Sequence, residues 1–101
     1  MVLKGEIKML IIKDVFGNIN VNVKSVYIGQ FNQLMITHYW NSYNPESNRE
    51  PITEEFNAHY IAKRVMDWIF AQMTSQRGAA NIIIDMIECP VIQDEGAFAD
   101  Y

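Results

Sequence analysis

The side chains with the most reactive chemistry are few and widely separated in this sequence. His38, His59 and Cys89 are its only imidazole and thiol groups, and their spacing matches no helical or hairpin metal-ligand pattern. Nucleophilic catalysis needs a nucleophile beside a base. The chain has no Gly-x-Ser-x-Gly sequence and no local pairing of a cysteine with a histidine. We therefore expect no catalytic residue, no metal site and no cofactor.

Carboxylates form the one arrangement that could support catalysis. The chain places Asp14 in the first expected strand and Asp85 in the last, with Glu54 and Glu55 opening the expected helix. This order is similar to the first half of the ribonuclease H-like fold, and the resemblance implies a metal-dependent nuclease whose carboxylates hold two metal ions. The later helices and strand of that fold have no counterpart here. Acidic residues in a first helical turn are also expected from the helix dipole alone.

Aromatic side chains gather around a polar segment in the middle of the chain. Residues 41–52 read NSYNPESNREPI, and their two prolines predict a long loop. Exposed aromatic side chains beside such a loop are typical of protein-binding surfaces. Base stacking is the alternative for aromatics on a sheet, but Arg49 is the only basic side chain in the loop. We predict a partner-binding surface made of Tyr39, Tyr43, Glu46, Arg49, Glu50, Glu54 and Glu55.

Charge and composition narrow the kind of partner. The net charge is −4, with +2 in residues 1–40 and −6 in residues 41–101. An acidic second half disfavours direct nucleic-acid binding, which depends on neutralising phosphates, and it suits a basic protein surface. No apolar run is long enough to span a membrane. A single cysteine fits a reducing compartment, so we expect a cytoplasmic protein, in the host cytosol if the chain is viral.

Alternating residues in the first half predict a three-stranded antiparallel meander. The expected strands cover residues 7–16, 19–28 and 33–40, with a turn at Gly17-Asn18 and another at residues 29–32. Between Ile19 and Val23 the aliphatic side chains are expected to face the core, and Asn20 and Asn22 to face water. The alternation then changes phase, which predicts a β-bulge near residues 24–25.

The second half predicts one long amphipathic helix and a fourth strand. Thr53 is the expected N-cap of this helix, and Arg77-Gly78 its C-terminal end. Residues 81–88 form the expected strand, and residues 89–101 an acidic, loosely held tail. The result is an α+β fold of order β-β-β-α-β in a single domain over residues 1–101. If Met9 is the natural start, residues 1–8 are an N-terminal extension.

This layout resembles small α+β proteins of bacteriophages and mobile elements, among them anti-CRISPR and other anti-defence proteins. The resemblance covers residues 9–88 and includes the D-x-x-G-N turn at residues 14–18. It implies a non-catalytic inhibitor that occupies a surface of a host defence complex, for example a basic nucleic-acid-binding surface. A phage structural or assembly subunit is the first alternative, with a homodimer as its simplest form, and the nuclease is the second.

Overall fold

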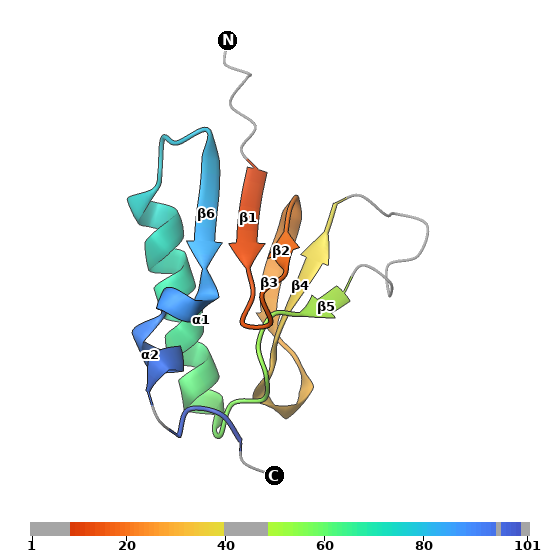
Figure 1. Cartoon of the computed structure of the whole chain (residues 1–101), viewed down its shortest axis with the longest axis vertical. Coiled ribbons are helices and arrows are strands. Elements are labelled where there is room, and N and C mark those ends of the chain that lie inside the picture. Colours follow the sequence, from red (N-terminus) through yellow and green to blue (C-terminus); the bar gives the residue numbers. More distant parts are fainter. Residues whose placement is uncertain (1–8, 40–48, 95, 100–101) are drawn as a thin grey trace.

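The protein is a small α+β structure, as the sequence predicts. The computed structural model describes residues 9–39, 49–94 and 96–99. Six short strands form two three-stranded sheets beside one long helix (Figure 1). In the part of the chain that is described, no helix is both long and apolar enough to cross a membrane. The elements are β1 (Met9–Lys13), β2 (Ile19–Asn20), β3 (Val23–Ile28), β4 (Leu34–His38), β5 (Arg49–Pro51), α1 (His59–Ser75), β6 (Asn81–Asp85) and α2 (Pro90–Gln93).

The strands are arranged differently from the predicted meander. β1 pairs antiparallel with β2 and parallel with β6, which gives the order β2-β1-β6. The second sheet has the antiparallel order β3-β4-β5. The expected strand over residues 19–28 is therefore two strands in two sheets. The chain breaks between them at Asn22, whose φ of 54° lies outside the range of an extended strand.

The expected orientation of the side chains in β2 is wrong. Ile19 is 69% exposed, whereas Asn20 is only 6% exposed. The reason is a buried polar network. The Asn20 side-chain amide donates to the Ile12 carbonyl oxygen (3.2 Å) and to Asp14 Oδ2 (3.0 Å). Hydrogen bonds to buried acceptors thus determine which face of β2 points inward, in opposition to the aliphatic alternation.

Other details of the strands agree with the sequence. The register between β3 and β4 shifts between Val23 and Ser25, which confirms the predicted bulge. Leu34, Ile36 and His38 are all buried on one face of β4. β5 was not predicted, because it lies in the expected loop, is only three residues long and ends at a proline. Ile52 is fully buried directly after it and holds this edge strand against the core.

The long helix begins later than predicted. α1 starts at His59, and its N-cap position is Ala58, which provides no side-chain hydrogen bond. Thr53 is instead fully buried, and its Oγ1 accepts a hydrogen bond from the Leu34 backbone N–H (2.9 Å). Glu54 and Glu55 consequently lie before the helix and not in its first turn. The buried side of α1 consists of Ile61, Ala62, Val65 and Ile69.

Much of the segment after β6 packs against the body of the protein, although a loosely held tail was expected. Cys89 is fully buried, and the Phe98 ring stacks on Phe56 with centroids 4.9 Å apart. Asn57 N–H donates to the Ala97 carbonyl oxygen (2.8 Å), and Ala99 N–H donates to the Glu55 carbonyl oxygen (2.8 Å). These contacts fasten the segment to the stretch that precedes α1.

Candidate protein-binding surface

The β3-β4-β5 sheet presents one face to the core and one face to solvent. Leu34 and Ile36 point into the core, where both are fully buried. Because side chains alternate along a strand, the residues between them lie on the other side. Strand register places Tyr27 beside Met35, and Thr37 beside both Ser25 and Arg49. We call this side the outer sheet face, and it consists of Ser25, Tyr27, Met35, Thr37, Arg49 and Pro51.

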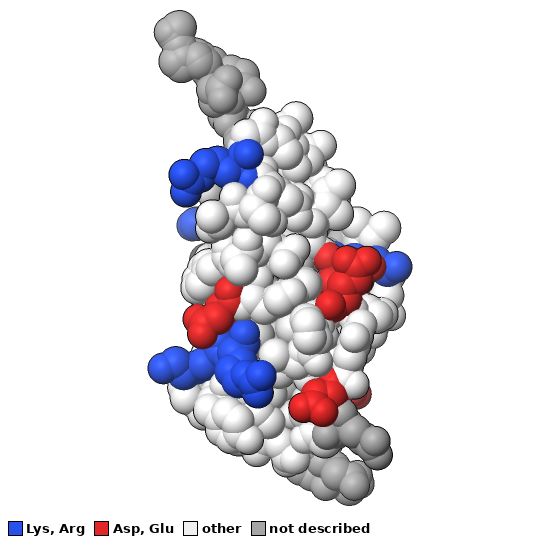
Figure 2. Space-filling view, turned by 90° about the vertical axis from the view of Figure 1, so that its left-hand side faces the viewer, with Lys and Arg blue, Asp and Glu red and all other residues white. Residues whose placement is uncertain are grey.

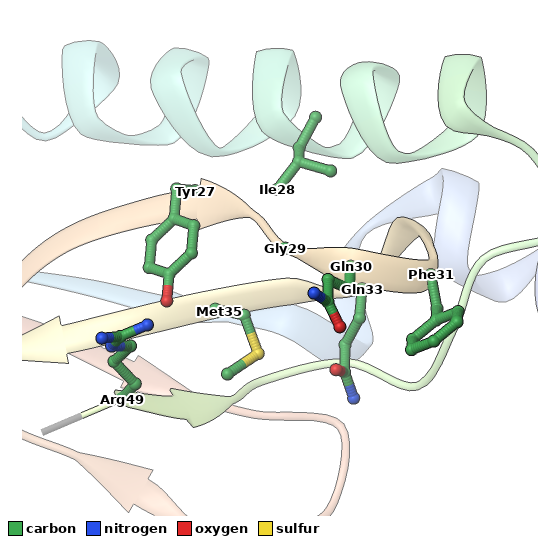
Figure 3. A pocket seen from close by; sticks show the side chains of 8 residues that line it. All are labelled: Tyr27, Ile28, Gly29, Gln30, Phe31, Gln33, Met35 and Arg49. Carbon is green, nitrogen blue, oxygen red and sulfur yellow. The ribbon is translucent and has the colours of Figure 1, made fainter. Parts of the chain in front are cut away.

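An open hollow of about 700 Å³ lies on the outer sheet face and the turn that follows β3. In Figure 3 the Tyr27 ring and the Arg49 side chain stand at one end and the Phe31 ring at the other, with Met35 between them. The Ile28 side chain points toward the helix and away from Met35 and Arg49. The lining residues are Tyr27, Ile28, Gly29, Gln30, Phe31, Gln33, Met35 and Arg49.

Phe31 has an unfavourable backbone and an exposed ring. It lies in a single 3-10 turn, Gln30–Asn32, with φ of 58° and ψ of 33°, and its side chain is 70% exposed. The next residue, Asn32, also has a positive φ of 54°. Left-handed conformations are rare for bulky residues and cost about 1–3 kcal/mol. The fold thus tolerates local strain at a position where a large aromatic ring contacts mainly water.

Gly29 is required at the floor of the hollow. A Cβ atom at this position would lie 2.7 Å from Met35 Cγ, closer than van der Waals contact permits. The turn is closed by a hydrogen bond from Gly29 N–H to the Gln33 carbonyl oxygen (2.7 Å). Gly29 and this bond therefore position Phe31 and Gln33 at the rim while leaving space for Met35.

The structure brings together only part of the predicted partner surface. Arg49 lines the hollow, and Tyr39, directly after β4, is exposed. Glu54 and Glu55 line a second, smaller hollow, and Gln33 borders both hollows. Two further predicted residues, Tyr43 and Glu46, lie outside the described residues.

Glu50 points to the opposite side of β5 from Arg49. Its Oε2 is 3.3 Å from His38 Nε2, and His38 Nδ1 is 3.1 Å from the Val21 carbonyl oxygen. Because a carbonyl oxygen only accepts, Nδ1 carries the proton of that hydrogen bond. His38 is buried, and it connects β4 to β5 and to the segment between β2 and β3. Glu50 therefore has a structural partner.

Asp14 and Asp85, the two strand carboxylates of the nuclease hypothesis, already have protein partners. Asp14 is buried, and its Oδ1 accepts from the backbone N–H groups of Phe16 and Asn18, both at 2.9 Å. Asp85 Oδ2 is 4.0 Å from Lys13 Nζ, and its Oδ1 accepts from Ile87 N–H (3.1 Å). Over the described ranges, no three His, Cys, Asp or Glu side chains are grouped closely enough to share a metal ion.

Charged side chains form small separate groups on the side of the molecule shown in Figure 2. Wide uncharged areas separate the acidic and basic groups there, and no continuous acidic area covers this side. The excess of acidic residues in the second half of the sequence therefore does not appear as one acidic face in this view.

Sequence reasoning missed the polar and apolar walls of the hollow. Of the residues that line the hollow, only Arg49 belongs to the predicted partner surface. The signal was present in the turn sequence Gly29-Gln30-Phe31-Asn32, where an aromatic residue occupies a position that is normally polar. No protein-family model, curated protein or solved structure matches this chain.

Proposed function

We propose that this protein is a non-catalytic binding module that recognises a protein partner with its outer sheet face and the adjoining hollow. The observation that carries the proposal is the strained, exposed Phe31 at the rim. Local strain of this kind clusters at functional sites, and phenylalanine is among the aromatic residues enriched in protein interfaces. Burying the Phe31 ring in a partner would recover the apolar contact that it lacks in the free protein.

The chemistry of the hollow supports recognition of a protein surface. Tyr27 and Met35 offer polarisable apolar contacts, and methionine adapts its shape to different partners. Gln30 and Gln33 offer amide donors and acceptors at the rim, and Arg49 offers a guanidinium group for a carboxylate or a carbonyl oxygen. This combination of aromatic, methionine and arginine side chains is typical of the central part of an interface.

An inhibitory role against a host defence complex belongs to the same proposal. It rests on the resemblance to small anti-defence proteins and on the acidic residues Glu54 and Glu55 in the neighbouring hollow. These carboxylates would meet a basic surface of the partner, such as one that binds nucleic acid, while Phe31 provides the apolar contact. Reversal of Glu54 to lysine should then slow association and make it less dependent on salt concentration.

The proposal is tested by a matched pull-down from a host lysate. We expect one protein to be captured by the wild-type chain and lost with Phe31→Gly. Phe70→Ala is the control, because Phe70 is an exposed aromatic residue on α1, away from the hollow. Capture that is equal for all three chains, or that is lost equally with both variants, would contradict the proposal.

An assembly subunit is the second candidate, and the exposed aliphatic side chains of the β2-β1-β6 sheet favour it. Ile19 is mostly exposed, and so is Ile83, at 58%. By strand register both lie on the side of that sheet opposite the buried Ile12 and Ile84. A chain that stays monomeric at every concentration in light scattering would remove this candidate.

A further inference from the structure

In the β2-β1-β6 sheet, the edge formed by β6 is occupied at its centre by one side chain. Within the described chain, β6 pairs with β1 alone, so its other side is an edge. Gln76 lies directly after α1 and fills this edge at its centre. Its Nε2 donates to the Ile83 carbonyl oxygen (2.7 Å), and its Oε1 accepts from Ile83 N–H (2.8 Å). The amide of Gln76 thus makes the two hydrogen bonds that a neighbouring strand would make.

The bonds to Gln76 establish which backbone groups of β6 face outward. The N–H and C=O groups of Ile83 point away from β1, and successive residues of a strand point to alternate sides. Asn81 and Asp85 therefore also present their backbone groups at the edge, while Ile82 and Ile84 pair with β1. The Ile83 side chain is mostly exposed on the outer side of the sheet, and Asn81 and Asp85 point to that same side.

The sequence of β6, NIIID, is complementary to itself in an antiparallel register centred on Ile83. In that register Ile83 lies opposite Ile83 of a second copy, and the two residues exchange both of their outward hydrogen bonds. Asn81 of each copy lies opposite Asp85 of the other, so an amide donor faces a carboxylate acceptor at both ends. The two exposed Ile83 side chains become neighbours on one face of a continuous six-stranded sheet.

We propose that β6 is a docking edge for β6 of a second copy of this chain, and that Gln76 keeps this edge closed in the monomer. Gln76 and the incoming strand compete for the same two backbone groups of Ile83. Removal of the Gln76 amide leaves an uncovered aliphatic edge, which is the type of edge that proteins normally protect from pairing. Dimer formation must therefore become tighter when Gln76 is shortened. This inference does not depend on the outer sheet face or on its partner.

Sedimentation velocity over a range of protein concentrations tests the inference with Gln76→Ala. We expect the dimer dissociation constant of this variant to fall by at least about tenfold relative to the wild-type chain. Ile83→Pro in the same background is the matched control. Proline removes the outward N–H of Ile83 and leaves the pairing of Ile82 and Ile84 with β1 intact, as is tolerated on an edge strand. The double variant should return to the wild-type dissociation constant.

A charge swap tests the register without changing the Ile83 backbone. In the Gln76→Ala background, Asn81→Asp sets two carboxylates opposite each other and should weaken the dimer about tenfold. Adding Asp85→Asn places an amide opposite a carboxylate again and should restore the dimer. Gln76→Ala that dimerises no more tightly than wild type would overturn the proposal. A dimer that is unaffected by both Ile83→Pro and Asn81→Asp would also overturn it, because its interface would lie elsewhere.

Discussion

At the scale of single residues, the first hairpin depends on one buried carboxylate. Asp14 accepts two backbone hydrogen bonds from the turn and one from the Asn20 amide, and all three bonds are lost if this side chain is removed. The Asn20 amide then keeps only its bond to the Ile12 carbonyl oxygen. Buried donors without acceptors are costly, since water cannot replace the lost bonds. The alternation of Asn20 and Asn22 with aliphatic residues looked like a wet strand face. It could not reveal this network, because the partner of Asn20 lies on another strand.

We predict that Asp14→Ala lowers the free energy of unfolding by about 2–4 kcal/mol, because three hydrogen bonds are lost, one of them from the buried Asn20 amide. Urea unfolding followed by circular dichroism measures the change. Asp67→Ala is the control: Asp67 is exposed on α1, and its loss should change the free energy by less than about 0.5 kcal/mol. Equal effects of the two substitutions would show that the Asp14 network does not stabilise the hairpin.

At the scale of elements, the alternation of apolar and polar residues predicted strands correctly where the burial of each residue depends on its neighbours in the sequence. β4 and β6 lie within the expected strands because their burial follows a period of two. The bulge in β3 was placed correctly because the alternation of aliphatic residues changes phase at that point. The errors occur where a tertiary contact outweighs the local preference. Thr53 resembles an N-cap in sequence, yet its hydroxyl is engaged by the Leu34 N–H of β4. β5 has too few residues to show a pattern.

The role of Thr53 can be separated experimentally from helix capping. Thr53→Val keeps the shape and removes the acceptor for Leu34 N–H, which should cost about 1–3 kcal/mol of unfolding free energy. Thr53→Ser keeps the hydroxyl and should retain most of that hydrogen-bond energy. Helix content measured by circular dichroism in the native state should be the same in both variants. A selective loss of helix in Thr53→Val would instead support the capping role.

At the scale of the whole molecule, the segment before α1 is in contact with the segment after α2. Phe56 precedes α1 and Phe98 follows α2, and their stacked rings bring these distant segments into contact. This closure could not be predicted from the sequence, because the apolar residues after Pro90 are few, follow no helical or strand period and are mixed with acidic side chains. The candidate site was only partly predictable for a related reason. The outer sheet face is formed by three strands, and the pairing of β5 with β4 was not predicted.

We predict that Phe98→Ala lowers the unfolding free energy by about 2–3 kcal/mol, through lost stacking and apolar burial. It should also expose the amides of Asn57 and Ala99 to hydrogen exchange. Phe70→Ala removes a ring of the same size from an exposed position, so its effect on stability should be much smaller. Unchanged amide protection in Phe98→Ala would show that the C-terminal segment is held by other contacts.

The central claim is that Phe31 is kept in a strained conformation for binding and not for folding. Phe31→Gly tests it most directly, because glycine adopts a left-handed conformation without strain. We expect this variant to unfold with a free energy about 1 kcal/mol higher than wild type, and to lose at least about tenfold in affinity for the captured partner by calorimetry. A variant that is less stable than wild type yet binds the partner with equal affinity would contradict the account.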